Sequence, residues 1–159
     1  MRQCNDRNDR AFSLIELVIV VVIIGIIAAI AIPRLSRGAA GAADAALIGD
    51  LAVMRSGIDL YSTEHVGDLP TLASVVNQMT QFTDINGNTS VTKGGLFIYG
   101  PYIRQIPPLP VGAQKGQTNI KAAPADGSGG FGWVYSSGLV FPNTAAGEVD
   151  DSGKPYSTY

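Results

Sequence analysis

A single carboxylate, Glu16, stands at the head of a run from Leu17 to Ile32 in which every residue is apolar or glycine. An acidic residue inside a membrane-spanning helix costs on the order of 2.5–3.5 kcal/mol on insertion scales. In an apolar medium a paired charge is tolerable, whereas an unpaired one is expensive. The chemistry open to Glu16 is therefore ion pairing with a group of opposite charge.

A free amine at Phe12 would supply that partner. If the chain is cut between Ala11 and Phe12, Glu16 lies about one helical turn after the new N-terminus, where the helix dipole favours a carboxylate. The carboxylate can also pair with the N-terminal amine of another copy of the same helix. Such a pair sets the register between neighbouring copies more than it stabilises them, which indicates a device for assembly.

Three structures compete for residues 12–32. As a helix these 21 residues span roughly 31 Å, which matches a bilayer core of about 30 Å. A buried helix of a soluble domain rarely runs this long without a polar face. A cleavable secretory signal would use the small residues "AIA" at 29–31 as its cleavage site, but a discarded signal has no use for Glu16. The third structure is a retained assembly helix that begins at Phe12.

The stretch "AFSLIELVIVVVIIGIIAAIAIP", residues 11–33, resembles the class III signal of type IV prepilins and pseudopilins. In that family a membrane prepilin peptidase cuts just before the Phe and N-methylates it. The resemblance implies that Ala11 precedes the cut, that Phe12 is the methylated terminus and that Glu16 is the assembly carboxylate. The family usually has Gly before the cut, so we expect slower processing at this Ala.

The same resemblance places Gly25 and Pro33 where the family has helix-loosening residues. Gly in a helix interior costs about 1 kcal/mol relative to Ala, and Pro removes a backbone hydrogen bond and kinks or ends the helix. Lipid-embedded helices tolerate both residues, so tolerance and partial unwinding in a filament both stay open. The excess of arginine before the span is only one residue, and the cytoplasmic position of the leader follows from the resemblance.

The sequence predicts three parts: a cleaved leader at 1–11, a transmembrane and assembly helix at 12–33, and a periplasmic domain at 34–159. The net charge is −2, which gives no electrostatic reason to expect nucleic-acid binding. The one cysteine is Cys4 in the leader, so no intramolecular disulfide can form. The third part is long enough for one small domain with a single core.

Helical periodicity continues beyond the apolar run. An apolar stripe with spacings of four and three predicts one long helix from about Phe12 to about His65, bent near Pro33; the stripe consists of Leu47, Leu51, Met54, Ile58 and Tyr61. A short second helix is expected over residues 72–82, with Thr71 as its cap.

The remaining pattern is that of a small antiparallel sheet. A turn is expected at Asn86-Gly87, and a strand followed by an extended, proline-broken loop over residues 95–110. Residues 133–135 and 139–141 predict a β-hairpin, and the tail from Asn143 is expected to be loop. The expected fold class is α+β, with the sheet packed on the outer half of the long helix.

Few residues could do other chemistry. His65 is the only histidine, and we expect it to cap the helix end in solvent rather than to catalyse or bind a metal. Secretion pseudopilins carry a calcium site in their C-terminal loops, and the candidate ligands here are Asp126, Asp150 and Asp151; flexible turns are the alternative. Trp133 and Tyr135 are expected in the core. No nucleotide loop, zinc spacing or nucleophile elbow occurs, so no enzyme and no other cofactor is predicted.

Two weaker matches refine the resemblance. "LYSTEHVGDLPT" and "YIRQIPPLP" are similar to segments of the major pseudopilin of type II secretion, and the lack of a C-terminal cysteine pair departs from many true type IV pilins. The resemblance implies an inner-membrane protein that polymerises into a periplasmic homo-oligomeric filament with minor pseudopilins and an assembly platform. A type IV pilin for adhesion, twitching or DNA uptake is the alternative, and an anchored periplasmic binding domain is a third.

Overall fold

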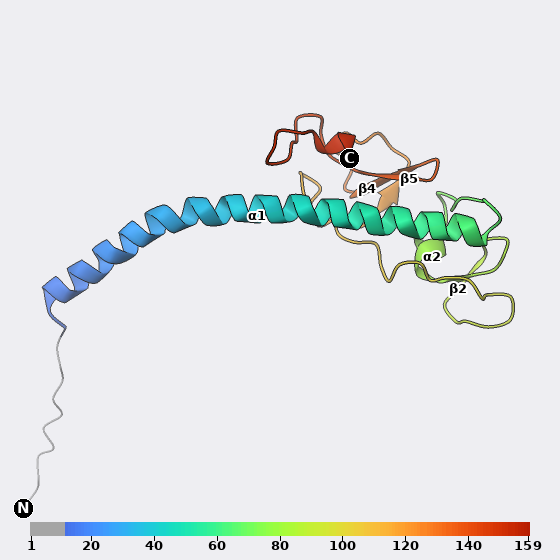
Figure 1. The fold of residues 1–159 in the computed structure, drawn as a ribbon, viewed down its shortest axis with the longest axis horizontal. Coiled ribbons are helices and arrows are strands. Elements are labelled where there is room, and N and C mark those ends of the chain that lie inside the picture. The colour runs from blue at the N-terminus through green and yellow to red at the C-terminus, as the bar shows by residue number, and fades with distance from the viewer. Residues whose placement is uncertain (1–11) are drawn as a thin grey trace, which may run out of the picture. The chain divides into compact units, whose positions relative to one another are not determined.

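The computed structural model describes residues 12–159, with the backbone only at residues 36 and 37. The chain forms two compact units, one ending at Gly38 and the other comprising Ala39–Tyr159 (Figure 1). The predicted leader, residues 1–11, lies outside the described residues.

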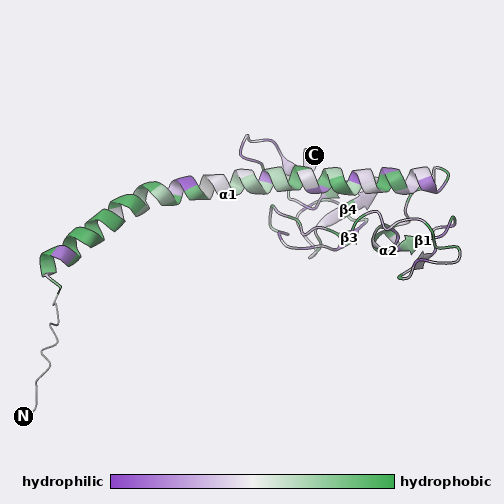
Figure 2. Ribbon diagram, turned by 60° about the horizontal axis from the view of Figure 1, so that its bottom comes forward, coloured by the Kyte–Doolittle hydropathy of each residue, from purple (hydrophilic) through white to green (hydrophobic). Residues whose placement is uncertain are grey.

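One helix, α1 (Leu14–Glu64), accounts for 51 residues and confirms the single long helix expected from the sequence. It is the one helix in the described part of the chain that is long and apolar enough to cross a membrane, and an 18-residue window of it has a mean hydropathy of 3.2. In Figure 2 the ribbon of the N-terminal part of α1 is mostly green, the colour of hydrophobic residues. The helix continues through Pro33. The bend expected there stays a prediction.

The second unit begins with the amphipathic part of α1. The predicted stripe is confirmed, because its five residues are no more than 2% exposed: Leu47, Leu51, Met54, Ile58 and Tyr61. They pack against Met79 of α2, against Leu109 in the loop that follows, and against Trp133 and Val140 of the sheet. The outer half of the helix therefore supplies one wall of the domain's core, as the pattern predicts.

The second helix, α2 (Val75–Thr80), is shorter than predicted and follows Ser74, not Thr71. The predicted capping role of Thr71 is wrong, because the helix begins only at Val75, four residues further on. The backbone N–H and the hydroxyl of Thr71 both donate to Oε1 of Gln78, at 2.8 and 3.5 Å. Residues 72–74 form a turn instead, and the helix starts after it.

A two-stranded antiparallel sheet follows, made of β1 (Phe82–Thr83) and β2 (Thr89–Ser90). The turn predicted at Asn86-Gly87 connects these strands. The carboxylate of Asp84 organises it by accepting hydrogen bonds from the backbone N–H groups of Asn86 and Asn88, both at 2.9 Å. This local network orders a region that has no clear periodicity in the sequence.

The strand predicted within residues 95–110 is wrong, whereas the extended loop is confirmed. Throughout this segment, which the structure describes completely, pairing is limited to single bridges, such as Gly94 with Phe97 and Thr83 with Tyr99. Four prolines between residues 101 and 110 remove backbone donors, which favours an extended loop in that part of the segment.

The C-terminal sheet contains β3 (Ile120–Lys121), β4 (Trp133–Ser136) and β5 (Leu139–Pro142). The predicted hairpin is confirmed: β4 and β5 pair antiparallel across Ser137 and Gly138, whose φ angles of 50° and 83° suit a two-residue turn. The expectation of purely antiparallel strands is wrong, because β3 pairs parallel with β4. The fold class is nevertheless α+β, as predicted.

Candidate assembly site

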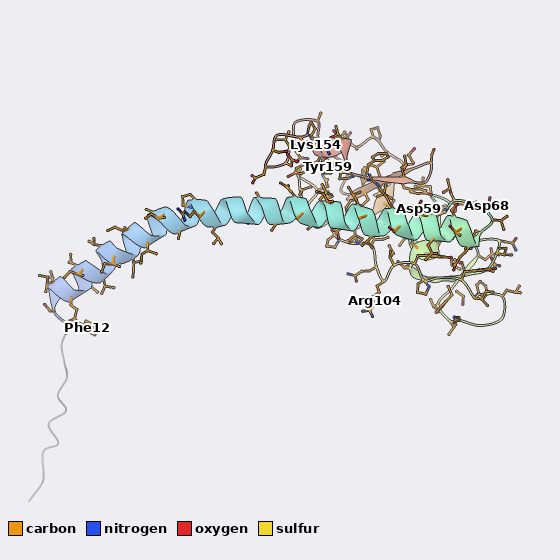
Figure 3. All side chains as sticks on the ribbon, in the orientation of Figure 1. Phe12, Asp59, Asp68, Arg104, Lys154 and Tyr159 are labelled. Carbon is orange, nitrogen blue, oxygen red and sulfur yellow. The ribbon has the colours of Figure 1, made fainter. Side chains whose placement is uncertain are left out.

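The predicted assembly residues lie at the start of α1. Phe12 precedes the helix by two residues and is 80% exposed, and Glu16 lies in the first helical turn. The backbone N–H of Leu17 donates to the carbonyl of Ser13 at 3.2 Å, so the helical pattern of hydrogen bonds starts just after Phe12 (Figure 3). The structure thus places Phe12 and Glu16 about one turn apart, at the positive end of the helix dipole. Ala11 lies outside the described residues.

The surface around Glu16 is apolar and uncovered. Leu14, Ile15 and Leu17 are 80, 66 and 61% exposed, and the other large apolar residues up to Leu35 are exposed too. A contiguous apolar surface of this extent marks a region that lipid or another protein covers. A carboxylate at its edge is therefore able to pair with a cation from a neighbouring helix. The pairing itself, and the cleavage and methylation at Phe12, stay predictions.

Gly25 and Pro33 lie inside α1 and touch little. No atom comes within 4 Å of a Cβ built on Gly25, so packing within the described chain does not require glycine there. Pro33 lacks the N–H that would bond to the carbonyl one turn earlier. Both residues weaken the local helix without making a site of their own, and their loosening role in a filament stays a prediction.

His65 does not cap the helix end in solvent, so that expectation is wrong. The residue is 1% exposed, and its ring stacks on Tyr61 with the centroids 3.8 Å apart. Its Nδ1 lies 2.9 Å from the carbonyl oxygen of Tyr61, and its Nε2 lies 2.9 Å from that of Asp84. The histidine therefore joins the end of α1 to the turn after β1. An aromatic residue one helical turn earlier was the signal for this stacking.

The three calcium candidates are separated into two loops. Oδ1 of Asp126 accepts from the backbone N–H and the hydroxyl of Ser128, at 2.9 and 2.7 Å, and these bonds lower the pKa of Asp126. Asp150 and Asp151 lie in the C-terminal loop. Within residues 12–159 no three His, Cys, Asp or Glu side chains gather as metal ligands. Calcium binding by these residues stays a prediction.

Asp150 is the centre of the C-terminal loop. Its Oδ1 accepts from the backbone N–H groups of Ser152 and Lys154, both at 2.8 Å, and its Oδ2 accepts from the hydroxyl of Tyr159. The Tyr159 hydroxyl and the Ser152 side chain lower the pKa of Asp150 most. The Nζ of Lys154 lies 3.5 Å from the centroid of the Tyr159 ring, a cation–π contact whose two residues Figure 3 labels. The tail expected to be plain loop is thus tightly bonded.

This tail is fastened to α1 at two points that sequence reasoning missed. Asp44 accepts from the hydroxyl of Tyr156 at 2.5 Å and from the backbone N–H of Asp151 at 3.0 Å. Arg55 donates to the carbonyl oxygens of Val140 and Tyr159, at 2.9 and 2.8 Å. The residues joined by these four bonds are 85 to 112 positions apart in the sequence, so no local pattern could have shown the bonds.

Trp133 and Tyr135 lie in the core, as predicted. Trp133 is fully buried, and its Nε1 donates to the carbonyl oxygen of Pro107 at 2.8 Å. The hydroxyl of Tyr135 donates to the carbonyl of Pro70 at 2.7 Å. These bonds fix the proline-rich segments against the C-terminal sheet and leave neither ring free to line a binding surface.

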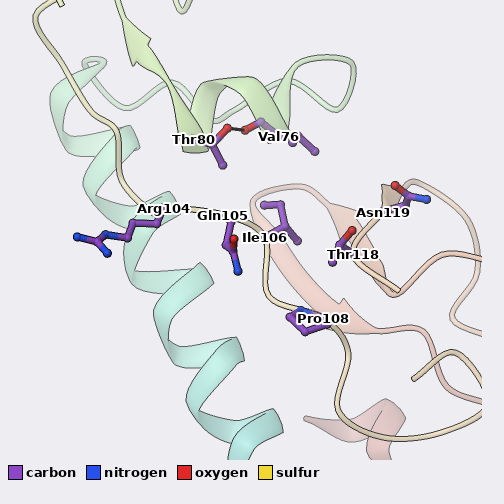
Figure 4. Close-up of a pocket in the computed structure, with 8 residues that line it drawn as sticks. All are labelled: Val76, Thr80, Arg104, Gln105, Ile106, Pro108, Thr118 and Asn119. Carbon is purple, nitrogen blue, oxygen red and sulfur yellow. Dashed lines mark hydrogen bonds between the residues drawn. The ribbon is translucent and has the colours of Figure 1, made fainter. Parts of the chain in front are cut away.

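The domain also has an open groove of about 510 Å³ between α2, the segment around Arg104 and the residues before β3 (Figure 4). Arg104 is the one ionisable residue among the residues that line it. Thr80 donates its hydroxyl to the Val76 carbonyl within the same helix, at 2.7 Å. The lining offers no acid–base pair and no nucleophile with a base beside it, so it does not suggest catalysis.

Comparison with known proteins supports the N-terminal part of this picture. Residues 6–32 match the family description "Prokaryotic N-terminal methylation motif". No curated protein and no solved structure matches the chain. The chain therefore carries a class III prepilin signal and is type IV pilin-like. The motif implies processing by prepilin peptidase and filament assembly, and the family of proteins that carry it is structural. Together with the apolar helix, the motif indicates a membrane-anchored protein.

Proposed function

We propose that this chain is a structural subunit of a type II secretion pseudopilus. Prepilin peptidase cuts it between Ala11 and Phe12 and methylates the new N-terminus, and the mature subunit waits in the inner membrane. An assembly platform then moves it into a short periplasmic filament with minor pseudopilins, which drives protein secretion. The observation that carries the proposal is the position of Glu16, in the first turn of a helix whose apolar surface its own chain leaves uncovered.

The mechanism is mechanical. Apolar side chains of the first unit exchange lipid for the same side chains of neighbouring copies, so little apolar surface meets water at any stage. The exchange alone has no preferred register, because a surface that is apolar all round packs in many ways. The Glu16 carboxylate supplies the register, since it is stable only where the Phe12 amine of a neighbour meets it.

Two features favour the secretion branch. Cys4 is the only cysteine and precedes the predicted cut, so the mature domain closes its C-terminal loop without a disulfide. The bonds of Asp44 and Arg55 to the tail hold that loop instead. The segments "LYSTEHVGDLPT" and "YIRQIPPLP" add the weaker likeness to the major subunit.

The decisive experiment is mass spectrometry of the purified protein. We expect a chain that begins at Phe12 and carries one methyl group on its amine. A chain beginning at Ile32 would indicate an ordinary secretory signal, and an intact Met1 an ordinary anchor, and either result would overturn the assembly proposal. Ala11→Gly serves as a control on the cut site, because it should be processed at least as fast as the parent.

A deletion strain separates the two kinds of filament. We expect loss of secreted proteins from the medium while twitching and surface fibres are unchanged. Normal secretion with lost surface fibres would mean that the subunit belongs to a type IV pilus.

A further inference from the structure

The second unit carries an exposed apolar loop. Ile85, Leu96 and Ile98 line one hollow of about 200 Å³ and are 45, 76 and 54% exposed. We call these three residues the apolar tip. They lie on the turn after β1 and on the loop that follows β2, at the end of the domain where α1 stops (Figure 1).

The exposure of this tip is built into an ordered backbone. Gly94 and Phe97 exchange two backbone hydrogen bonds, of 3.2 and 3.1 Å, which close a tight turn around Gly95 and Leu96. Gly95 has a φ of +60°, a value that favours glycine. Leu96 is thus held outward at a turn, although three-quarters of its side chain meets solvent. A fixed, exposed apolar turn of this kind marks a contact surface.

The same unit carries a complementary hollow on α1. Five helix residues and Tyr102 line a groove of about 370 Å³ at the edge of the core: Ala52, Val53, Ser56, Gly57 and Leu60. Val53 and Leu60 are 57 and 50% exposed. We call this surface the helix groove. Small residues at 52, 56 and 57 make it concave.

We propose that the apolar tip of one copy of this chain occupies the helix groove of the next copy. The inference rests on the proposed filament and names one contact within it. Leu96 of the tip stands outward at its turn and the groove is hollow, and the residues that form both surfaces are mainly apolar. Lys93 is exposed in the tip's loop, and Asp59 is exposed on α1 one turn after Ser56, so opposite charges border the two surfaces.

The geometry of this contact suits a filament. Tip and groove are different surfaces, so the contact is heterologous: every copy offers a free groove at one side and a free tip at the other. Contacts of this type continue into open helical assemblies when the rotation does not close a ring. A tip that met another tip would instead stop at a dimer.

Engineered cysteines test this contact directly, because the chain has no cysteine besides Cys4. In a Cys4→Ser background, Leu96→Cys and Ser56→Cys are combined, and fibres are oxidised before denaturing electrophoresis. We expect a ladder of dimers, trimers and longer species from the double variant and only monomers from each single variant. Leu139→Cys, at a position 52% exposed in β5, replaces Leu96→Cys in a matched control that should stay monomeric.

Charge exchange tests the orientation. Lys93→Asp or Asp59→Lys should each reduce the cross-linked fraction at least several-fold, and the two together should restore it. Fibres that assemble normally while the double-cysteine variant stays monomeric would overturn this contact and leave the proposed function standing. Dimers from Leu96→Cys alone would show a tip-to-tip contact, and adducts of another mass would show a different partner. Either result would overturn the proposed contact. Failure of the unsubstituted chain to form any fibre would overturn both proposals.

Discussion

The two parts of α1 are one continuous helix, but their apolar side chains differ in exposure to solvent. Leu17 is 61% exposed and Leu51 is 2% exposed, although both are leucines of the same helix. Around Leu17 the residues are apolar on every side, so no single face could be covered by the chain itself. Around Leu51 apolar and polar residues alternate with the helical period, and the domain covers the apolar face.

The difference shows where each part finds its partner. A stripe predicts a partner in the same chain, because only one face has to be covered. A helix that is apolar all round predicts a partner outside the chain, either lipid or other copies. Glu16 lies on the part of α1 that is apolar all round, and its expected partner is another copy. Arg55 lies on the part with a single apolar stripe, and it bonds to the C-terminal tail of its own chain.

The largest expected effect comes from Glu16→Val. The variant should insert and be cut like the parent, yet it should form no fibres when it is the only copy in the cell, because the helices lose their register. Electron microscopy of sheared fibres and the mass of the N-terminus measure the two steps separately. Glu64→Gln, at the other end of the same helix, should assemble normally. Normal fibres from Glu16→Val would disprove the pairing.

The second effect compares two matched truncations on α1. Leu51→Ala should lower the free energy of unfolding of the domain by about 2–5 kcal/mol, because it removes buried methyl groups and leaves a cavity. Leu17→Ala should leave that free energy unchanged, since its side chain has no partner in the domain. Thermal unfolding in detergent, followed by near-UV circular dichroism, measures both. Equal destabilisation by the two variants would contradict the view that the domain covers α1 at Leu51 but not at Leu17.

A third effect concerns the fastening of the tail. Tyr156→Phe removes the hydroxyl that donates to Asp44 and should cost about 1.5–3 kcal/mol, the usual range for a bond to a charged group. The amide protons of residues 149–159 should exchange faster with solvent, while those of the β4–β5 hairpin should not. Thr158→Val, which loses a bond made only within the tail at 2.7 Å, is the control and should have a smaller effect on exchange near Asp44. Unchanged exchange in Tyr156→Phe would mean that Asp44 does not hold the tail.

Much of the long helix could be predicted from sequence because its signals are local. The stripe from Leu47 to Tyr61 and the β-prone residues on both sides of Ser137-Gly138 each depend on neighbours a few positions away. The position of Glu16, four residues after Phe12, is also a local signal. The family description found at residues 6–32 rests on this local pattern as well.

The errors occurred where distant residues decide the structure. β3 pairs parallel with β4 across a long connection, and two strand residues carry too little pattern to show it. Thr71 does not cap α2 because the turn of residues 72–74 comes between them and the helix begins at Val75. His65 looked like a solvated helix end because two residues that contact it, Asp84 and Tyr99, come 19 and 34 positions later.

The smallest predicted effect is a pH dependence of stability in the second unit. The Asn88 side-chain amide and the backbone N–H groups of Asn86 and Asn88 lower the pKa of Asp84, outweighing the opposite effect of burial. A carboxyl whose pKa is lower in the folded state stabilises the fold above its unfolded pKa of about 3.9. That contribution is lost as the pH falls below about 4 towards the folded value.

Asn88→Ala isolates this contribution. Without the amide donor the pKa of Asp84 rises towards its ordinary value, so the acid-dependent fall in stability should become shallower below pH 4. The variant should also be less stable than the parent at pH 7, by less than Leu51→Ala, because it loses the 2.8 Å bond between Nδ2 and the Asp84 carboxylate. Asn77→Ala in the exposed face of α2 controls for the loss of an amide. Parallel pH profiles for the parent and Asn88→Ala would mean that the turn after β1 is held by its backbone alone.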